Sequence, residues 1–529
     1  MSERGAGSVR GALLGVVAVL AIGAAVYLPW LGSRGFGASE GHRVVPAVEF
    51  AERGSWLVPT MFDTPYLRKP PGMPIAIMLS SEAFGWTELS ARLVSAASVI
   101  LTGGLLAMIG SRWFGSRVGW TAGAAYVLSP VVLPIGRAAE IEALHGLFVT
   151  AAAVLAIELV LRKPGKALDR AVIGGVAFGI ALLGALLTKG PAGAPSIIGA
   201  VIAGVLLAGR PRRWRSIASP AILVGVVVAG GVSLWLYSLF MGDLRQRSEP
   251  YVTQSPLAFS FEAGRLLAIA GLPIAALGSH LPAGLAMLPL LGWRGSRPGD
   301  RLARAAALAW CLSIVVFMLF GVSNNRYVLP SLGLACLVVP WAIDGFAHRF
   351  GGWRRLLCGV GTLGSPRIVL AVLVVAAGAR HVLVERREAI KSGREPGIAI
   401  ADALAEDTSL PIELWADELI EARPETLLAT ERRGEELGRE LRVFWSASWD
   451  PVEADGPSLP AAPAGLARYA VLRRDTDQYG SSELERFVEA GLAHRLVPVY
   501  DGGIYPDGTD NEGNTVYRYP ITVFRIAPE

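Results

Sequence analysis

Long apolar stretches recur along this 529-residue chain up to residue 384, and they restrict its fold more than any other feature. A helix needs about twenty apolar residues to cross the hydrocarbon layer, where each backbone polar group must be bonded within the segment. Only 18% of the residues are charged and 52% are hydrophobic, which is too apolar for a soluble protein of this length. We therefore expect a polytopic α-helical membrane protein with eleven spans, near residues 11–30, 90–110, 118–135, 142–161, 171–188, 192–208, 217–240, 268–291, 303–321, 327–346 and 367–384.

The loops between these stretches alternate in charge. Arginine and lysine cluster in every second loop, around residues 112–117, 162–170, 210–215, 294–304 and 349–367. Basic loops remain on the cytoplasmic side of a membrane, so the net charge of +5 reflects topology rather than nucleic-acid binding. An odd number of spans then places residues 31–89 and the C-terminal tail together on the outer side. Thirteen spans would give the same result.

The first apolar stretch has two interpretations. Arg4 and Arg10 precede it, as basic residues precede the apolar core of a secretory signal peptide. The stretch continues to Trp30 and further spans follow, and both features favour an uncleaved first transmembrane helix.

The tail differs in composition from the rest of the chain. Residues 386–529 are rich in charge, with β-forming segments at 411–417, 468–474, 495–501 and 515–527 and helical spacing at 396–407 and 481–493. We expect a transmembrane domain over residues 1–385 and a small α/β soluble domain over residues 386–529. The acidic run 507–514 departs from the spacing of an EF-hand, which favours a plain turn over a calcium site.

Residues 39–72 form a polar stretch that we interpret as the active-site loop. The stretch carries both signs of charge and contains five prolines, and irregular backbone of this kind must pack on protein or face water. The next segment, residues 74–86, is apolar but too short to span, so we expect an interfacial or re-entrant helix there.

Ionisable side chains gather in the loops of the outer side. Such residues are costly at the lipid boundary, so their concentration on one side points to function. A carboxylate there can remove a proton from an acceptor, and Arg or Lys can neutralise a phosphate leaving group. The candidates are Glu40, His42, Arg43, Asp63, Arg68, Lys69, Arg137, Glu140, Glu142, Lys189, Arg265, His280 and Arg326.

Several candidates also have a structural interpretation. Glu40 would cap the helix that follows it, and Arg137 with Glu142 would form an interfacial anchor and an ion pair. Lys189 would extend from an apolar run to the interface, and Arg326 would open a helix there.

Short motifs follow one another in a particular order from residue 39 onwards. They are S-E at 39–40, G-S-W-L-V-P at 54–59, Y-L-R-K-P-P at 66–71, R-L at 92–93, R-W-F-G at 112–115, S-P at 129–130, Arg137 with Glu142, T-K-G-P at 188–191 and R-Y-V-L-P at 326–330. In this order they resemble the GT-C polyprenol-phosphate-sugar-dependent glycosyltransferases, in particular the branch of bacterial aminoarabinose transferases of lipid A and protein O-mannosyltransferases. Each motif is short, but the ordered set over residues 11–346 is specific.

The resemblance implies a GT-C-like fold and a reaction at the membrane surface. A sugar would pass from an undecaprenyl phosphate carrier to a lipid, protein or envelope glycan acceptor, on the outer face of the bacterial inner membrane. The implied partners are this donor, the acceptor and membrane lipids, and no nucleic acid. The implied residues are Glu40 and Glu142 for catalysis, Lys69, Arg137, Lys189 and Arg326 for the donor phosphate, and His42, Arg43, Tyr66 and Tyr327 as further members of the site.

The chain departs from the pattern of this family at the presumed base. The family carries Asp as the first of its two acidic loop residues, and this chain has Ser39 there, followed by Glu40. Glu142 also stands where Asp is usual. Either Glu40 or Glu142 acts as the base, or the chain is catalytically altered, and we favour Glu40.

The sequence predicts no metal or other cofactor. The branch is not known for requiring a metal, and the first outer loop has no D-x-D motif. His42 and His280 stand alone, which favours structural roles, and the three cysteines form neither a disulfide framework nor a zinc-binding spacing.

Two non-enzymatic readings compete with the transferase. A flippase or transporter of lipid-linked sugars requires polar residues deep within spans. Most spans here are uniformly apolar, with Glu158 as a partial exception, which favours chemistry at the surface. A degenerate transferase that acts as a binding or assembly subunit remains open because of Ser39.

Overall fold

The computed structural model describes residues 3–37, 40–54, 56–62, 64–66, 69–161, 168–208, 270–276, 280, 299–319, 325–339, 394–407, 410–416, 424–445, 466–473, 495–509, 515–527 and parts of 223–238. The chain forms two compact units. The helical unit comprises Met1–Leu31, Arg68–Met73 and Arg92–His381. The loop–tail unit comprises Gly32–Leu67, Pro74–Ala91 and Val382–Glu529, so most of the predicted outer loop groups with the tail.

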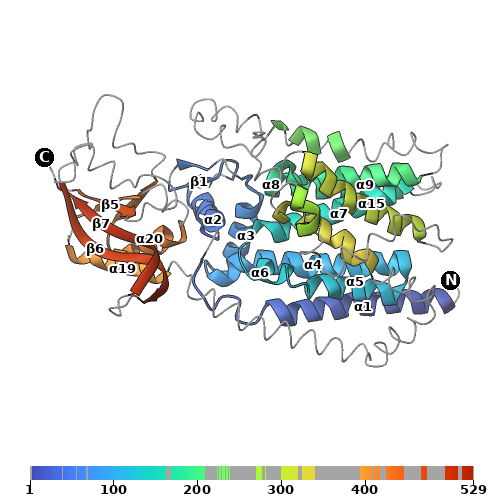
Figure 1. Cartoon of the computed structure of the whole chain (residues 1–529), viewed down its shortest axis with the longest axis horizontal. Helices are drawn as coiled ribbons and strands as arrows, with labels where there is room; N and C mark the ends of the chain where they lie inside the picture. The colour runs from blue at the N-terminus through green and yellow to red at the C-terminus, as the bar shows by residue number, and fades with distance from the viewer. Residues whose placement is uncertain are drawn as a thin grey trace. The chain divides into compact units, whose positions relative to one another are not determined.

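The described part of the helical unit consists of α-helices and short 3-10 helices (Figure 1). Its described elements are α1 (Glu3–Tyr27), α4 (Glu88–Phe114, from Arg92 onwards), α5 (Ser116–Val127), α6 (Val132–Gly136), α7 (Ile141–Leu161), α8 (Leu168–Lys189), η1 (Gly190–Gly193), α9 (Ala194–Leu207), α15 (Asp300–Leu319), η3 (Asn325–Tyr327) and η4 (Leu329–Ser331).

Five helical stretches in the described part of the chain are long and apolar enough to cross a membrane. They are Val9–Tyr27, Glu88–Phe114, Ile141–Leu161, Ile173–Leu207 and Asp300–Leu319. They confirm the helices predicted near 11–30, 90–110, 142–161, 171–188, 192–208 and 303–321, and their length and apolar composition are those of a membrane protein. A shorter apolar helix, Leu329–Val339, covers part of the span predicted at 327–346. The span predicted at 367–384 and most of those at 217–240 and 268–291 lie outside the described residues.

The single span predicted over residues 118–135 is wrong. Helix α5 ends at Val127, and the short α6 begins only at Val132. Pro130 explains the break, because proline lacks the amide that continues a helix and disfavours helical geometry at the residue before it. The amide of Ser129 bonds instead to the carbonyl of Tyr126 in a turn.

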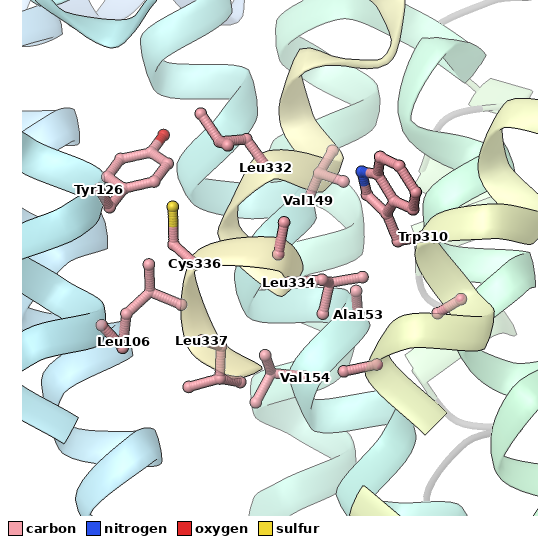
Figure 2. Close-up of a cluster of buried hydrophobic side chains, with 14 of the residues drawn as sticks. Leu106, Tyr126, Val149, Ala153, Val154, Trp310, Leu332, Leu334, Cys336 and Leu337 are labelled. Atoms are coloured by element: carbon pink, nitrogen blue, oxygen red, sulfur yellow. The ribbon is translucent and has the colours of Figure 1, made fainter. Parts of the chain in front are cut away.

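The core of the helical unit surrounds α7, which is buried along most of its length. Figure 2 shows Val149, Ala153 and Val154 of α7 beside Leu332 and Leu337 from the segment after η4. Tyr126 and Leu106 approach this cluster from α5 and α4, and Trp310 approaches it from α15. Side chains from widely separated segments therefore hold α7, and with it the residues at its first turn.

Small residues let α4 and α5 approach closely. A Cβ at Gly123 would lie 2.4 Å from the carbonyl oxygen of Gly103, and one at Gly119 would lie 2.4 Å from the carbonyl oxygen of Ala107. Small side chains at one face allow apolar helices to bring their backbones together, and dispersion contacts then stabilise the pair.

We expect Gly123→Val to destabilise the protein by about 1–3 kcal/mol, because the new side chain must push α5 away from α4. Ala125→Val is the matched control, since Ala125 lies on the exposed face of the same helix and should change stability by only about 0.5 kcal/mol. Thermal unfolding of the two variants in detergent measures the difference. Equal unfolding midpoints would contradict close packing at Gly123.

The loop–tail unit combines loop elements with an α/β domain. Its elements are α2 (Gly41–Arg53), β1 (Thr60–Met61), β2 (Thr64–Pro65), α3 (Gly72–Phe84, from Pro74 onwards), α19 (Arg394–Asp407), β3 (Ile412–Ala416), α20 (Pro424–Glu436), β4 (Leu441–Trp445), β5 (Ala467–Arg473), β6 (Leu496–Thr509) and β7 (Thr515–Ile526). The five-stranded sheet has the order β4-β3-β5-β7-β6. Strand β3 is parallel to both neighbours, whereas β7 is antiparallel to β5 and β6.

The α/β class predicted for the tail is confirmed, together with the helix at 396–407 and all four named strand segments. Helix α20 and strand β4 were not among the predicted elements. The helix predicted at 481–493 lies outside the described residues, as does most of the acidic run 507–514. Tyr469 of β5 donates its hydroxyl to Asp407 at the end of α19, and burial, followed by this bond, raises the pKa of Tyr469.

Candidate functional site

The Y-L-R-K-P-P motif reaches the end of α8 through the glycine that follows it. A Cβ at Gly72 would lie 2.6 Å from the carbonyl oxygen of Leu187 and 3.1 Å from the amide nitrogen of Thr188, so this approach requires glycine. Lys69 lies three residues before Gly72 and is half-buried, and Lys189 directly follows Thr188. The contact brings together two segments that were predicted to bind a donor phosphate.

A buried ion pair joins α7 to α8. Lys189 ends α8, because Gly190 follows it with a φ of 60° in the left-handed region, and Glu142 lies in the first turn of α7. The Lys189 Nζ lies 3.1 Å from Glu142 Oε1, and the two side chains are only 7% and 5% exposed. Each charge suits the helix end that carries it, and each compensates the burial of the other.

Arg326 and Tyr327 of η3 complete this charged cluster. The guanidinium of Arg326 lies 3.6 Å from Glu142 Oε1 and 3.5 Å from Glu140 Oε1, and its side chain is 50% exposed. The Nζ of Lys189 lies 4.7 Å from the centroid of the Tyr327 ring, within the range of a cation–π contact. The structure thus unites Glu142, Lys189, Arg326 and Tyr327, which the sequence spreads over almost two hundred residues.

Two further residues lie at this cluster: Glu140, one of the outer-side candidates, and His145, which was not among the candidates. Glu140 pairs with Arg326, and its backbone amide and carbonyl both bond to the hydroxyl of Ser95. His145 is buried one turn after Glu142, and a Cβ at Gly193 would lie 3.1 Å from its Cε1. Glu140 and His145 flank Glu142 in the sequence. A histidine within an apolar run is the signal by which the sequence could have identified His145.

Arg137 has different surroundings from Arg326. It is 4% exposed and donates to the carbonyl oxygens of Tyr27 and Pro29 at 2.8 Å and of Val26 at 3.2 Å. These carbonyls are at the C-terminal end of α1, where backbone acceptors need partners and a cation is favoured. The bonds anchor the end of α1, and contact between Arg137 and a donor phosphate stays a prediction.

Glu40 lies in the loop–tail unit, immediately before α2. Its side chain is almost fully buried, and Oε2 accepts the amide of Gly37 at 3.0 Å and lies 3.5 Å from the Arg34 guanidinium. Glu40 is the N-cap residue of α2, as the structural alternative expected, but its carboxylate makes no capping bond and turns back to Gly37. Only its backbone carbonyl joins the helix, by accepting the amides of Arg43 and Val44.

The remaining loop candidates gather around α2. His42 follows Glu40 closely, and its ring centroid lies 6.0 Å from that of the buried Tyr66. Arg43 is the next residue of the same helix and is half-buried. Gly54 ends α2 with a φ of 64° and donates its amide to Phe50, which accounts for the glycine of the G-S-W-L-V-P motif.

His280 contacts Trp310 of α15. It is buried, and its Nδ1 accepts the indole N–H of Trp310 at 2.9 Å. Within the described residues, no group of three or more His, Cys, Asp or Glu side chains is arranged to hold a metal ion. Ser39, Asp63, Arg68 and Arg265 lie outside the described residues.

A family model and two curated relatives match this chain. The model for dolichyl-phosphate-mannose-protein mannosyltransferases matches residues 68–237. The undecaprenyl phosphate-α-4-amino-4-deoxy-L-arabinose arabinosyl transferases of Proteus mirabilis and Pectobacterium carotovorum are 22% and 24% identical. Each alignment covers 62% of this chain and 59% of the relative, so the chain matches about three fifths of the length of these proteins.

Solved structures share the fold over nearly the whole chain. ArnT from Cupriavidus metallidurans, in the apo state and bound to undecaprenyl phosphate, superposes with a TM-score of 0.64 at 16% and 18% identity, over 96% of this chain and 97% of ArnT. The Archaeoglobus fulgidus oligosaccharyltransferase bound to an acceptor peptide reaches 0.52 at 12% identity, over 96% of this chain and 74% of that chain.

The protein therefore has the GT-C architecture, a bundle of membrane helices followed by a C-terminal α/β region. Within this class, the family model over residues 68–237, the two curated relatives and the ordered motifs make the chain similar to the polyprenol-phosphate-sugar glycosyltransferases.

The ion pair between α7 and α8 should be important for stability. We expect Glu142→Gln to destabilise the protein by about 3 kcal/mol, because it leaves the charge of Lys189 buried beside a neutral amide. Arg326→Gln should cost less than about 1 kcal/mol, because that side chain is half exposed. Unfolding midpoints in detergent compare the two variants, and an equal loss would contradict the burial of the pair.

Proposed function

We propose that this protein is a membrane glycosyltransferase that transfers a sugar from a polyprenyl phosphate, most simply undecaprenyl phosphate, to a lipid, protein or envelope glycan acceptor. The observation that carries the proposal is the cluster around Glu142, in which a half-exposed arginine and a buried lysine meet at the ends of membrane helices. Cations at this position suit a phosphate held at the level of the lipid headgroups.

The donor phosphate would bind to the cations of this cluster. The guanidinium of Arg326 lies 3.5 and 3.6 Å from its two carboxylate partners. These distances are longer than that of a strong charge-assisted hydrogen bond, and half of the side chain is exposed. It can therefore exchange a carboxylate for a phosphate at small cost. Lys189 is held by Glu142, and the Gly72 contact brings the segment of Lys69 to the end of α8. We assign the phosphate to Arg326, Lys189 and Lys69.

The two catalytic carboxylates would have different tasks. Glu142 orients the cations, because it contacts Lys189 and Arg326 directly. Glu40 removes the proton from the acceptor hydroxyl or amine, while the acceptor atom bonds to the anomeric carbon and the bond from that carbon to the phosphate oxygen breaks. The cations stabilise the charge that develops on the departing phosphate. Direct displacement inverts the configuration of the anomeric carbon.

The reaction would take place on the outer face of the bacterial inner membrane. The alternating basic loops predict this topology, with the α/β tail on the same side as the outer loop. A lipid-linked donor and an acceptor from the aqueous side would then meet at the ends of α7 and α8.

The transporter alternative is weakened by the environment of Glu158. This carboxylate accepts the indole N–H of Trp113 at 2.8 Å and lies 3.5 Å from the guanidinium of Arg112. A side chain with these partners at the end of α7 has a local structural role. Glu158 is the partial exception among the mostly apolar spans, and its local partners give it a role other than lining a transport path.

The experiment is transfer of label from radiolabelled undecaprenyl phosphate sugars by membranes that contain the wild type, Glu40→Gln or Glu142→Gln. We expect Glu40→Gln to lower kcat by about 10²–10⁴-fold with an unchanged KM for the donor, as removal of a general base does. Glu142→Gln should raise the KM for the donor, because the cations lose their partner. Glu158→Gln is the control and should stay active, since its carboxylate lies away from this cluster.

The outcomes separate the alternatives. Full activity of Glu40→Gln with loss of kcat in Glu142→Gln would transfer the role of the base to Glu142. Absence of transfer from every sugar tested, with the donor still bound, would identify a degenerate transferase and contradict the proposed function.

A further inference from the structure

The tail contacts the helix that follows Glu40. Within the loop–tail unit, the start of α20 packs on the start of α2. A Cβ at Gly41, the first residue of α2, would lie 2.4 Å from the amide nitrogen of Glu425 and 2.8 Å from Cγ of Pro424. Real Cβ atoms do not approach other heavy atoms so closely, so glycine alone permits this contact.

Glu425 places a carboxylate at the same contact. It lies in the first turn of α20 and is 2% exposed, and its Oε2 would be 3.0 Å from a Cβ at Gly41. A buried carboxylate is costly unless its surroundings compensate it, and the N-terminal turns of two helices supply partial positive charge. The carboxylate of Glu425 therefore favours an arrangement in which the first turns of α2 and α20 stay together.

Within the tail, helix α20 is firmly attached to helix α19. Arg433 near its end donates to Asp402 of α19 at 2.8 Å. A Cβ at Gly397 of α19 would lie 2.5 Å from the carbonyl oxygen of Thr426, so the two helices also approach closely near the start of α20. A helix that is held along its length can transmit the position of the tail to α2.

We propose that the C-terminal domain holds Glu40 in its reactive position through the contact between α20 and α2, with Glu425 as a positioning residue. Glu40 moves with α2, because its carbonyl oxygen accepts the amides of Arg43 and Val44 in the first turn. A shift of that turn by about 1 Å would misplace the carboxylate and lower the rate by about 100-fold. This inference rests on the proposed function and assigns the tail a task in catalysis.

The test uses full-length protein in membranes with three substitutions at the contact. Gly41→Ala introduces the clash, Glu425→Ala removes the carboxylate, and Glu425→Gln keeps the shape while removing the charge. We expect Gly41→Ala and Glu425→Ala to lower kcat by about 100-fold, and Glu425→Gln to lower it less, all with an unchanged KM for the lipid-linked donor. Glu435→Ala, on the exposed face of α20, is the matched control and should retain wild-type kcat.

A second measurement keeps the inference testable whether or not transfer is observed. Hydrogen exchange of the amides in residues 41–53 should be faster in Gly41→Ala and Glu425→Ala than in the wild type and Glu435→Ala, because α2 loses its support. Wild-type kcat in the three contact variants, or unchanged exchange in α2, would overturn the inference. If the wild type and the contact variants transfer sugar equally well, the inference fails and the proposed function stands. If the wild type transfers no sugar, the proposed function fails, and hydrogen exchange still tests the contact between α20 and α2.

Discussion

The buried pair of Glu142 and Lys189 is the interaction on which the candidate site depends. Two charges that are almost removed from water must stay together, so the first turn of α7 and the last turn of α8 have to meet. Arg326 and Tyr327 then contact the same pair from η3. A single requirement of electrostatics thus aligns three segments that are distant in the sequence.

The apolar bundle makes this requirement easy to meet. Helix α7 is buried among side chains from α4, α5, α15 and the segment after η4, which limits the freedom of its first turn. Small residues at helix contacts, such as Gly103 with Gly123 and Gly199 against the carbonyl oxygen of Ala309, fix the separation of the helices. The charges remain at the ends of these helices, where contact with headgroups and water is possible.

Composition was sufficient to predict the membrane class and the described long spans, because burial in lipid requires long apolar runs. Periodicity was sufficient to predict the α/β tail, because apolar residues in strands and in helices recur with different periods. They failed where local chemistry overrides an apolar run, as at Pro130 between α5 and α6. They also failed where a residue is defined by a distant partner. Gly41 and Glu425 are ordinary in the sequence, and their importance arises from a contact across almost four hundred residues.

Arg137 and Arg326 show why residue type alone does not identify a ligand-binding cation. Both are arginines of the ordered motifs. Arg137 is buried and donates to backbone carbonyls at 2.8 Å, so a ligand would have to replace strong, well-oriented bonds. Arg326 is half exposed, and its carboxylate partners lie at 3.5 and 3.6 Å, so a phosphate would replace much weaker interactions. The difference in cost, rather than the charge, is the reason that we propose Arg326 as the phosphate-binding arginine.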